Sequence, residues 1–493
     1  MLIRNPQFAI RNRQWLLLTL LLTSFALRLH ALLQLPGFVD EGNHLLWAAE
    51  VWQGRVIYPF STAKPLEIFY LALLMPFQNP LWVGRLGSVL LGLVTMSSLW
   101  ALARRWGDGN TGLWAAMFYT VTPWTFFHER MAVADPLVAA LAVTTAWVAT
   151  RYAARPSAKR TIGLAICLVA LPLAKLSAAP LMAMPVIVVA LTKWRQLRRL
   201  WLPYVGAVVA LAIILTPAAL RYGVFGEITL RAEAAGRTSW IEAVARNTTD
   251  FADWAFAYGG ASVGLALLGC GIVVARRSPL GWMALAGCLL GMCYIALPAR
   301  AFPRYYLPAL AFVSLLAAEA VKFALGLFAA RWFRRTPVVV VFLVVVLPFA
   351  TFASQAYRDP AALPLVEIDR FQHVTNWSSG YGIRQAAMFT ADQIVRDSQP
   401  VVYAADLSTR VIARLYWPHG ANSEIYVLWD AIAPKVIDVV ASGRPAYLMV
   451  DTSRDIADFS GLAINPHELA RFYRPLSSEP IIVYRLTAEP FAP

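Results

Sequence analysis

Long apolar runs separated by short polar turns dominate the first 355 residues of the chain. A helix needs about 20 mostly apolar residues to cross a bilayer, and about eleven runs approach that length. We therefore predict an α-helical polytopic membrane protein. The runs are 15–35, 81–103, 112–127, 133–150, 161–173, 176–191, 200–220, 259–274, 280–297, 307–330 and 337–353. A further run, 68–77, is too short to span and is expected to lie in the interface or dip into the membrane.

The pattern changes after residue 355, where long apolar runs stop. Short β-type segments alternate with amphipathic ones, which predicts a small α/β domain over 356–493. The expected strands are 401–406, 424–429, 445–450 and 480–485, and the expected helices are 408–416, 431–441 and 467–472. Because the last apolar run leads outward, this domain is expected to be extracytoplasmic. It has no Gly-x-Gly-x-x-Gly turn, so no nucleotide site is inferred.

Composition agrees with a membrane protein, because 59% of the 493 residues are apolar and only 14% are charged. The net charge of +15 could by itself suggest a nucleic-acid partner. The basic residues, however, gather in alternate turns, as the positive-inside rule requires, and we expect no nucleic-acid binding. These turns are 104–105, 151–160, 193–199, 276–277 and 331–335. Arginines also precede the first run, so we expect the N-terminus to be cytoplasmic. The first run is too long for a cleaved signal, and a multi-pass plasma (inner) membrane protein is expected.

The four cysteines, Cys167, Cys270, Cys288 and Cys293, all lie within apolar runs. None has the spacing of metal ligands, so buried thiols without a disulfide framework are expected. Glu319 and Lys322 lie three residues apart within one run, and we expect them to pair on one face of a helix.

Two adjacent carboxylates, Asp40 and Glu41, follow the first apolar run, in a polar loop (36–80) that is predicted to lie outside. A carboxylate at the mouth of a helical bundle can meet a substrate and have a tuned pKa, as a general base requires. We therefore interpret Asp40 as a catalytic base. The alternative is structural: Asp40 would be the N-cap of a helix running through His44 and Trp47, with Glu41 favoured by the helix dipole.

Several cations are predicted on the same side as Asp40, namely Lys64, Lys175, Arg300 and Arg304. Together they would suit an anionic, lipid-linked substrate, although each alone could simply anchor the chain at the interface.

The turn 128–130 and Asp135 are expected at the same outer side. Asp135 either caps the following helix or binds an acceptor. A divalent metal is left open, with His128 and Glu129 as its candidate ligands.

These features occur in the order of short motifs that resemble the GT-C superfamily of membrane glycosyltransferases, in the branch of the protein O-mannosyltransferases and the aminoarabinose transferases of lipid A. The resemblance covers residues 1–355. It departs from the family where a second proline is missing after Lys64-Pro65 and where Gly87 replaces a proline. The motifs are Asp40-Glu41, Lys64-Pro65-Leu66, Arg85-Leu86-Gly87-Ser88, Arg130-Met131-Ala132 with Asp135-Pro136, and Arg304-Tyr305-Tyr306-Leu307-Pro308. A stretch near the start of the C-terminal domain, Ser379-Gly380-Tyr381-Gly382, is assigned no role.

The resemblance implies a polyprenyl-phosphate sugar donor and an inverting transfer to an acceptor hydroxyl on the outer face, with residues 1–355 as the catalytic domain. Asp40 would take the hydroxyl proton, with Glu41 assisting it. The implied substrate-binding residues are Lys64, Arg130, Asp135, Lys175, Arg300 and Arg304. The acceptor is left open among glycan, lipid and protein, membrane lipids are further partners, and no cofactor is certain.

The alternative is a transporter or flippase of lipid-linked sugars, which would more often show inverted repeats and charges near the bilayer midplane.

Overall fold

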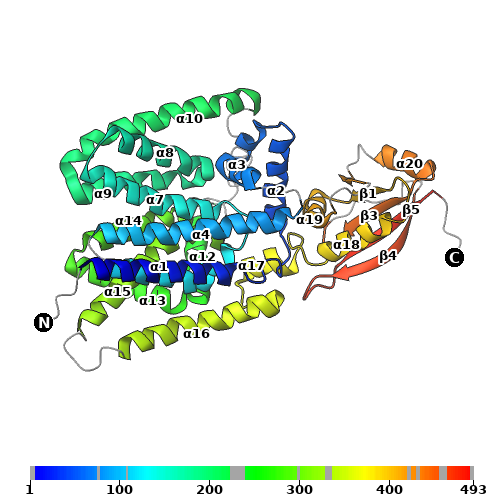
Figure 1. The fold of residues 1–493 in the computed structure, drawn as a ribbon. Helices are drawn as coiled ribbons and strands as arrows, with labels where there is room; N and C mark the ends of the chain where they lie inside the picture. Colours follow the sequence, from blue (N-terminus) through cyan, green and yellow to red (C-terminus); the bar gives the residue numbers. More distant parts are fainter. Residues whose placement is uncertain are drawn as a thin grey trace. The chain divides into compact units, whose positions relative to one another are not determined.

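The computed structural model describes residues 6–74, 78–106, 109–222, 239–296, 300–327, 336–418, 423–428, 433–454 and 464–488. The chain divides into two compact units (Figure 1). The helical unit consists of Met1–Leu32, Trp47–Leu74 and Gly84–Arg358. The sheet unit consists of Leu33–Leu46, Met75–Val83 and Asp359–Pro493. The stretch that carries Asp40 and Glu41 therefore groups with the C-terminal residues.

Helices form most of the first 358 residues, as the apolar runs predict. In chain order they are α1 (Pro6–Leu29), α2 (Val39–Trp52), α3 (Pro65–Leu74), α4 (Pro80–Arg105), α5 (Gly109–Val121), α6 (Pro123–His128), α7 (Asp135–Ala154), α8 (Ala158–Ala174), α9 (Met184–Lys193), α10 (Trp201–Tyr222), α12 (Trp240–Trp254), α13 (Gly260–Arg276), α14 (Pro279–Gly291), α15 (Leu307–Leu327) and α16 (Thr336–Arg358). Short turns of helix connect some of them, among them η1 (Tyr58–Thr62), η2 (Leu176–Ala183), η3 (Trp194–Leu200), η4 (Ala255–Gly259), η5 (Cys293–Ala296) and η6 (Pro303–Tyr306).

Every predicted apolar run overlaps a helix, but the predicted count of about eleven spans is not confirmed. Within the described ranges, six helical segments are long and apolar enough to cross a membrane. They are Pro80–Arg105, Asp135–Ala154, Leu176–Arg221, Trp240–Arg276, Pro279–Ala296 and Pro303–Leu327. The run at 68–77 corresponds to α3, which is apolar and too short to span, as predicted.

Two helical regions differ from the sequence prediction. The run 112–127 is divided into α5 and α6 at Pro123, because proline lacks the amide hydrogen that a continuous helix needs. The predicted outer loop 221–258 contains α12, which continues through the π-helical turn η4 into α13. The apolar residues of α12 are interrupted by polar ones, among them Arg246, Asn247 and Asp250, a pattern that a search for continuous apolar runs misses.

Helix α15 lies at the centre of the helical unit and contacts α5, α7, α13 and α14. Two glycines allow the neighbouring helices to approach closely. A Cβ on Gly269 would lie 2.1 Å from the Leu316 carbonyl oxygen, and one on Gly291 would lie 2.6 Å from the Ala309 nitrogen. Helix α7 packs against α8, α9 and α15, which fixes the start of α7, the end of α8 and the turn before α15 relative to one another.

The sheet unit contains five strands in the order β2-β1-β3-β5-β4. They are β1 (Val401–Ala404), β2 (Ile425–Val427), β3 (Ala446–Asp451), β4 (Asn465–Tyr473) and β5 (Pro480–Thr487). Strand β1 is parallel to β2 and β3, whereas β5 is antiparallel to β3 and β4. The helices among them are α17 (Glu367–Arg370), α18 (Ile383–Ile394), α19 (Leu407–Ala413) and α20 (Ala433–Ala441), so the predicted combination of a small sheet with helices is present (Figure 1).

The predicted helix 467–472 is wrong, because these residues belong to strand β4. Good helix formers in the stretch His-Glu-Leu-Ala-Arg favour a helix locally. Pairing with β5 overrides that preference, and the strand accommodates it with an irregularity between Glu468 and Ala470. Pairing with a neighbouring strand therefore determines the secondary structure of a short segment where the local preference of its residues does not.

Alternate residues of the central strands enter two separate cores, as the two-residue period of a strand requires. Val402 and Met449 face the core beneath α18 and α19, and Val401 and Leu448 face the core beneath α20. Val39, the first residue of α2, packs against the first of these cores. The start of α2 is therefore anchored by the core of the sheet unit.

Candidate functional site

The first turn of α2 carries the two candidate catalytic carboxylates. The helix begins at Val39, so Phe38 is its N-cap and Asp40 lies in the first turn rather than at the N-cap. The fully buried Glu41 carboxylate accepts a hydrogen bond from the Phe38 amide at 3.2 Å, which is the reciprocal half of a capping box. The capping role considered for Asp40 thus falls to Glu41, while Asp40 is half-buried.

The chain before Asp40 is held by residues far away in the sequence. The Val39 amide donates to the Ser378 carbonyl at 3.0 Å, and the Gly37 amide donates to the Tyr416 hydroxyl at 2.6 Å. All these residues belong to the sheet unit, so the backbone that presents Asp40 is fixed by contacts within one compact body.

The stretch Ser379-Gly380-Tyr381-Gly382, to which the sequence assigned no role, takes part in this contact. A Cβ on Gly380 would lie 2.1 Å from the Gly37 carbonyl oxygen and 2.9 Å from Pro36 Cβ. The Ser379 hydroxyl donates to the His373 carbonyl at 2.9 Å. Only glycine permits this approach, so Gly380 matters because of its missing side chain.

A second group of predicted residues meets in the helical unit, around the first residue of α7. Lys175 Nζ lies 2.6 Å from Asp135 Oδ1, and Arg304 Nε lies 3.8 Å from Asp135 Oδ2. All three residues are buried, with 3–8% of their surface exposed. Asp135 therefore bridges two cations supplied by the end of α8 and by η6.

Aromatic rings surround these cations, and the sequence did not single out Tyr294 or Phe302 among them. Lys175 Nζ lies 3.5 Å from the centroid of the Tyr305 ring and 5.6 Å from that of Tyr294. The Arg304 guanidinium carbon lies 4.6 Å from the centroid of the Phe302 ring. Rings at these distances attract cations and hold them in place. Tyr294 falls within a predicted span, and its position in an apolar run gave no reason to separate it from core residues.

Lys64 approaches the same cluster from the loop before α3. The neighbouring Ala63 carbonyl accepts a hydrogen bond from the Leu176 amide at 3.0 Å, next to Lys175, and the charge of Lys64 acts on Asp135. Lys64 Nζ also lies 5.8 Å from the centroid of the Trp47 ring. The structure thus brings together four of the six predicted substrate-binding residues.

The other two predicted binding residues have local partners. Arg130 donates to the carbonyls of His30 and Ala31, at 2.9 and 2.7 Å, just beyond the end of α1. Burial, above all, lowers the pKa of Arg130 to about 10, so this side chain stays charged at neutral pH. Arg300 is half-exposed and pairs with Asp250 at 3.2 Å. Binding of substrate by either arginine stays a prediction.

Glu129 is engaged in a buried ion pair that the sequence did not reveal. Its Oε2 lies 2.7 Å from Arg28 Nε, and its Oε1 accepts a hydrogen bond from the Tyr119 hydroxyl at 2.6 Å. Arg28 lies within the first apolar run, where a charged residue is itself a signal of a specific partner. His128 Nδ1 lies 2.9 Å from the Trp124 carbonyl oxygen.

No group of three or more potential metal ligands occurs in the described part of the chain. Glu129 is held by an arginine and a tyrosine, an environment that suits an ion pair better than a metal. A divalent metal nevertheless remains an open prediction.

The free cysteines and the pair Glu319–Lys322 agree with the sequence interpretation. The four thiols are buried or partly buried. Glu319 and Lys322 approach to 4.0 Å on one face of α15. These residues have structural explanations and take no part in the candidate site.

Comparisons with known proteins bear on the fold that carries these residues. Residues 64–219 match the family model described as dolichyl-phosphate-mannose-protein mannosyltransferase. No curated protein matches the whole sequence significantly.

Among solved structures, the chain is similar to ArnT from Cupriavidus metallidurans in the apo state, with 15% identity, a TM-score of 0.59, and coverage of 97% of this chain and 98% of that one. It is also similar to the same protein bound to undecaprenyl phosphate, with 14% identity, a TM-score of 0.57, and coverage of 95% and 97%.

The matched family segment contains Lys64, Asp135 and Lys175, and the structural similarity extends over both units of the chain. The family model is that of a mannosyltransferase and covers about a third of the chain, and the similarity to ArnT, at 14–15% identity, shows a shared fold. The resemblance predicted from the motifs is thereby confirmed: the chain has an ArnT-like fold and, over residues 64–219, the sequence pattern of the dolichyl-phosphate-mannose-protein mannosyltransferases.

Proposed function

We propose that the protein is an inverting glycosyltransferase, which moves a sugar from a polyprenyl-phosphate donor to an acceptor hydroxyl at the outer face of the membrane. The acceptor is a glycan, a lipid or a protein. In this proposal the N-terminus is cytoplasmic and the C-terminal domain is extracytoplasmic. Residues 1–355 form the catalytic membrane domain and residues 356–493 the outer domain.

The observation that carries the proposal is the buried cluster of Asp135, Lys175 and Arg304, with Lys64 beside it. A lysine and an arginine held by one carboxylate are pre-organised donors for an anion. Such donors are most effective where charge develops during the reaction. In transfer from a lipid phosphate, that charge develops on the phosphate oxygen that leaves the sugar.

The comparison with ArnT supports a lipid phosphate as the anion. That protein has been crystallised with undecaprenyl phosphate, and the similarity spans nearly the full length of both chains. A lipid-linked donor also gives a reason for a catalytic cluster built into a unit with several membrane-length helices.

Asp40 is proposed to supply the base. In the transfer, the acceptor oxygen forms a bond to the anomeric carbon as its proton passes to the Asp40 carboxylate. The bond from the anomeric carbon to the phosphate oxygen breaks, and its electron pair leaves with the lipid phosphate. Attack opposite the leaving group inverts the anomeric configuration. Glu41, fixed by the Phe38 amide, keeps the first turn of α2 in place.

The proposal is tested with variants that remove the base and one phosphate-binding cation one at a time. Asp40→Asn is expected to lower kcat by about 10²–10⁴-fold, as loss of a general base does. Lys64→Met is expected to lower kcat/KM by about 10²-fold, because it removes one donor to the leaving phosphate. Lys193→Met removes the same charge from an exposed position and is the matched control.

The assay follows sugar transfer from a panel of polyprenyl-phosphate sugars to acceptor membranes by the purified variants. Equal activity of Lys64→Met and Lys193→Met would remove the phosphate site from the mechanism. Full activity of Asp40→Asn would leave Asp40 a purely structural residue of the first helical turn.

A further inference from the structure

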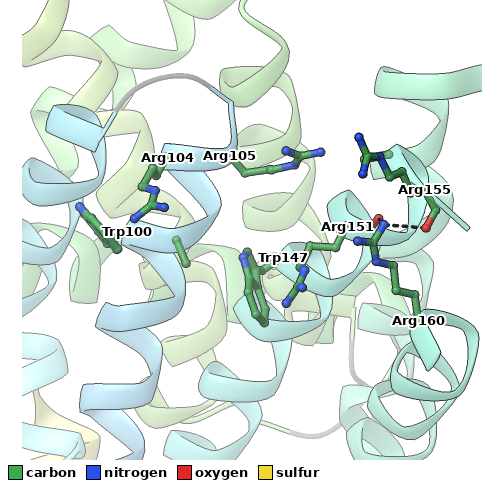
Figure 2. A pocket seen from close by; sticks show the side chains of 9 residues that line it. Trp100, Arg104, Arg105, Trp147, Arg151, Arg155 and Arg160 are labelled. Carbon is green, nitrogen blue, oxygen red and sulfur yellow. Dashed lines mark hydrogen bonds between the residues drawn. The ribbon is translucent and has the colours of Figure 1, made fainter. Parts of the chain in front are cut away.

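Five arginines converge on one cavity that is separate from the candidate site. The cavity has a volume of about 660 Å³ and lies between the end of α4, the end of α7 and the start of α8. Figure 2 shows Arg104 and Arg105 of α4 on one side of it and three arginines on the other. The three are Arg151, Arg155 and Arg160. A volume of this size is typical of sites that bind small molecules.

The cavity is strongly positive. No aspartate or glutamate is among its lining residues, and none of the five arginines has a carboxylate partner within the described ranges. Arg160 is the most constrained, since it donates to the carbonyls of Arg151 and Arg155 at 3.0 and 2.6 Å. Five like charges around one cavity repel one another, so this arrangement is stabilised when an anion binds.

Two arginines are held in place by tryptophans. The Arg104 guanidinium carbon lies 5.0 Å from the Trp100 ring centroid, and that of Arg151 lies 4.9 Å from the Trp147 ring centroid. A stacked guanidinium is ordered in advance and still presents its planar fork of donors, which matches the oxygens of a phosphate. Tryptophan is also enriched where membrane helices meet the headgroup layer.

The cavity and the Asp135 cluster lie at opposite ends of α7. Sixteen residues separate Asp135 from Arg151 on this helix, which at 1.5 Å per residue amounts to about 24 Å. That distance approaches the thickness of the hydrocarbon core of a bilayer, about 30 Å. The basic cavity therefore lies at the headgroup level of one leaflet if the Asp135 cluster lies near the other.

We infer that this cavity binds the phosphate-bearing headgroup of an anionic phospholipid. The positive-inside rule explains basic residues in every inner turn. It does not explain why those of two turns meet around one cavity together with two tryptophans. The position at the ends of membrane-length helices favours a lipid over a soluble anion, since a headgroup is delivered to this level by the bilayer itself. The inference concerns a site distinct from the sugar-transfer cluster and does not rest on that reaction.

The test is native mass spectrometry of the full-length protein in detergent, titrated with phosphatidylglycerol, phosphatidylethanolamine or inorganic phosphate. The wild type is expected to retain phosphatidylglycerol in preference to phosphatidylethanolamine. The double variant Arg104→Gln, Arg151→Gln is expected to bind phosphatidylglycerol about 25-fold more weakly, because each arginine near a membrane surface contributes about fivefold to the affinity for an anionic lipid. The control pair, Arg195→Gln with Arg198→Gln, removes the same charge from exposed positions on η3 and is expected to bind within twofold of the wild type.

If the two double variants lose the same affinity for phosphatidylglycerol, the inference is overturned. The attraction for the lipid would then be spread over the whole basic surface and would not come from this cavity. Binding of inorganic phosphate without retention of phosphatidylglycerol would also overturn it and would show a site for a soluble anion. A measurement that needs no variant is the salt dependence of the wild type. Phosphatidylglycerol retention is expected to fall as the salt concentration rises, and retention that is independent of salt contradicts a site built on arginines.

Discussion

Substitution of Gly380 by alanine adds one methyl group at the contact that supports the start of α2. The new Cβ would lie 2.1 Å from the Gly37 carbonyl oxygen, whereas ordinary van der Waals contact begins at 3.4 Å. The two segments must therefore separate by about 1.3 Å. Asp40 lies three residues beyond Gly37, so the displacement is passed to the proposed base through one short stretch of backbone.

A misplacement of about 1 Å in a catalytic group lowers the rate by about 10²-fold. We expect Gly380→Ala to lower kcat for sugar transfer by that factor while every proposed catalytic side chain is still present. Overpacking of this kind also lowers the free energy of unfolding by about 1–3 kcal/mol. The assay compares kcat with the thermal unfolding midpoint, so that a displaced base is distinguished from an unfolded protein.

Gly271→Ala is the matched control, because a Cβ at Gly271 meets no atom within 4 Å. Tyr416→Phe is a milder change at the same contact, since it removes the hydroxyl that accepts from the Gly37 amide and adds no atoms. It is expected to lower kcat in the same direction as Gly380→Ala and by a smaller factor. If Gly380→Ala retains kcat within twofold of Gly271→Ala, the sheet unit does not position Asp40 and the reasoning is refuted.

Three further substitutions test buried contacts through stability measured in detergent. Gly92→Ala is expected to destabilise the protein, because its Cβ would lie 2.7 Å from the carboxylate of Glu129. Arg28→Met is expected to lower the free energy of unfolding by about 3–5 kcal/mol, since it leaves Glu129 buried without its cation. Arg474→Met is expected to have a similar effect, of about 3–5 kcal/mol, because Arg474 forms two hydrogen bonds with the buried Asp451.

Controls for the two arginine changes come from replacing both partners of each ion pair. In Arg28→Met, Glu129→Gln the uncompensated buried charge is gone, and about half or more of the lost stability is expected to return. The same reasoning applies to Arg474→Met, Asp451→Asn. A double variant no more stable than the single arginine variant would show that the arginine acts through packing rather than through charge.

Local patterns predicted much of the helical unit, because burial in a membrane leaves long apolar runs in the sequence. They failed where the signal was periodic rather than continuous, as in α12, and where pairing between strands overrode local preference, as in β4. The number of membrane-length segments could not be read from run length alone. Prolines such as Pro123 divide runs into shorter helices.

The candidate site was predictable in part. Lys64, Asp135, Lys175 and Arg304 were singled out as cations and a carboxylate near the outer ends of predicted spans, and the structure gathers them. The support of Asp40 was not predictable. The hydrogen bond from Gly37 to Tyr416 joins residues 379 positions apart, and no local pattern records a contact over that separation.

The most direct test of the account is transfer by the purified wild type and Asp40→Asn, with polyprenyl-phosphate sugars as donors and NMR of the product's anomeric centre as the readout. The account predicts that the wild type transfers sugar from one donor with inverted configuration. It also predicts that Asp40→Asn, still folded, is slower by about 10²–10⁴-fold. Retained configuration, or equal rates for the two proteins, would contradict it. Movement of intact lipid-linked sugar across vesicles containing the wild type, without any transfer, would replace the glycosyltransferase with a transporter.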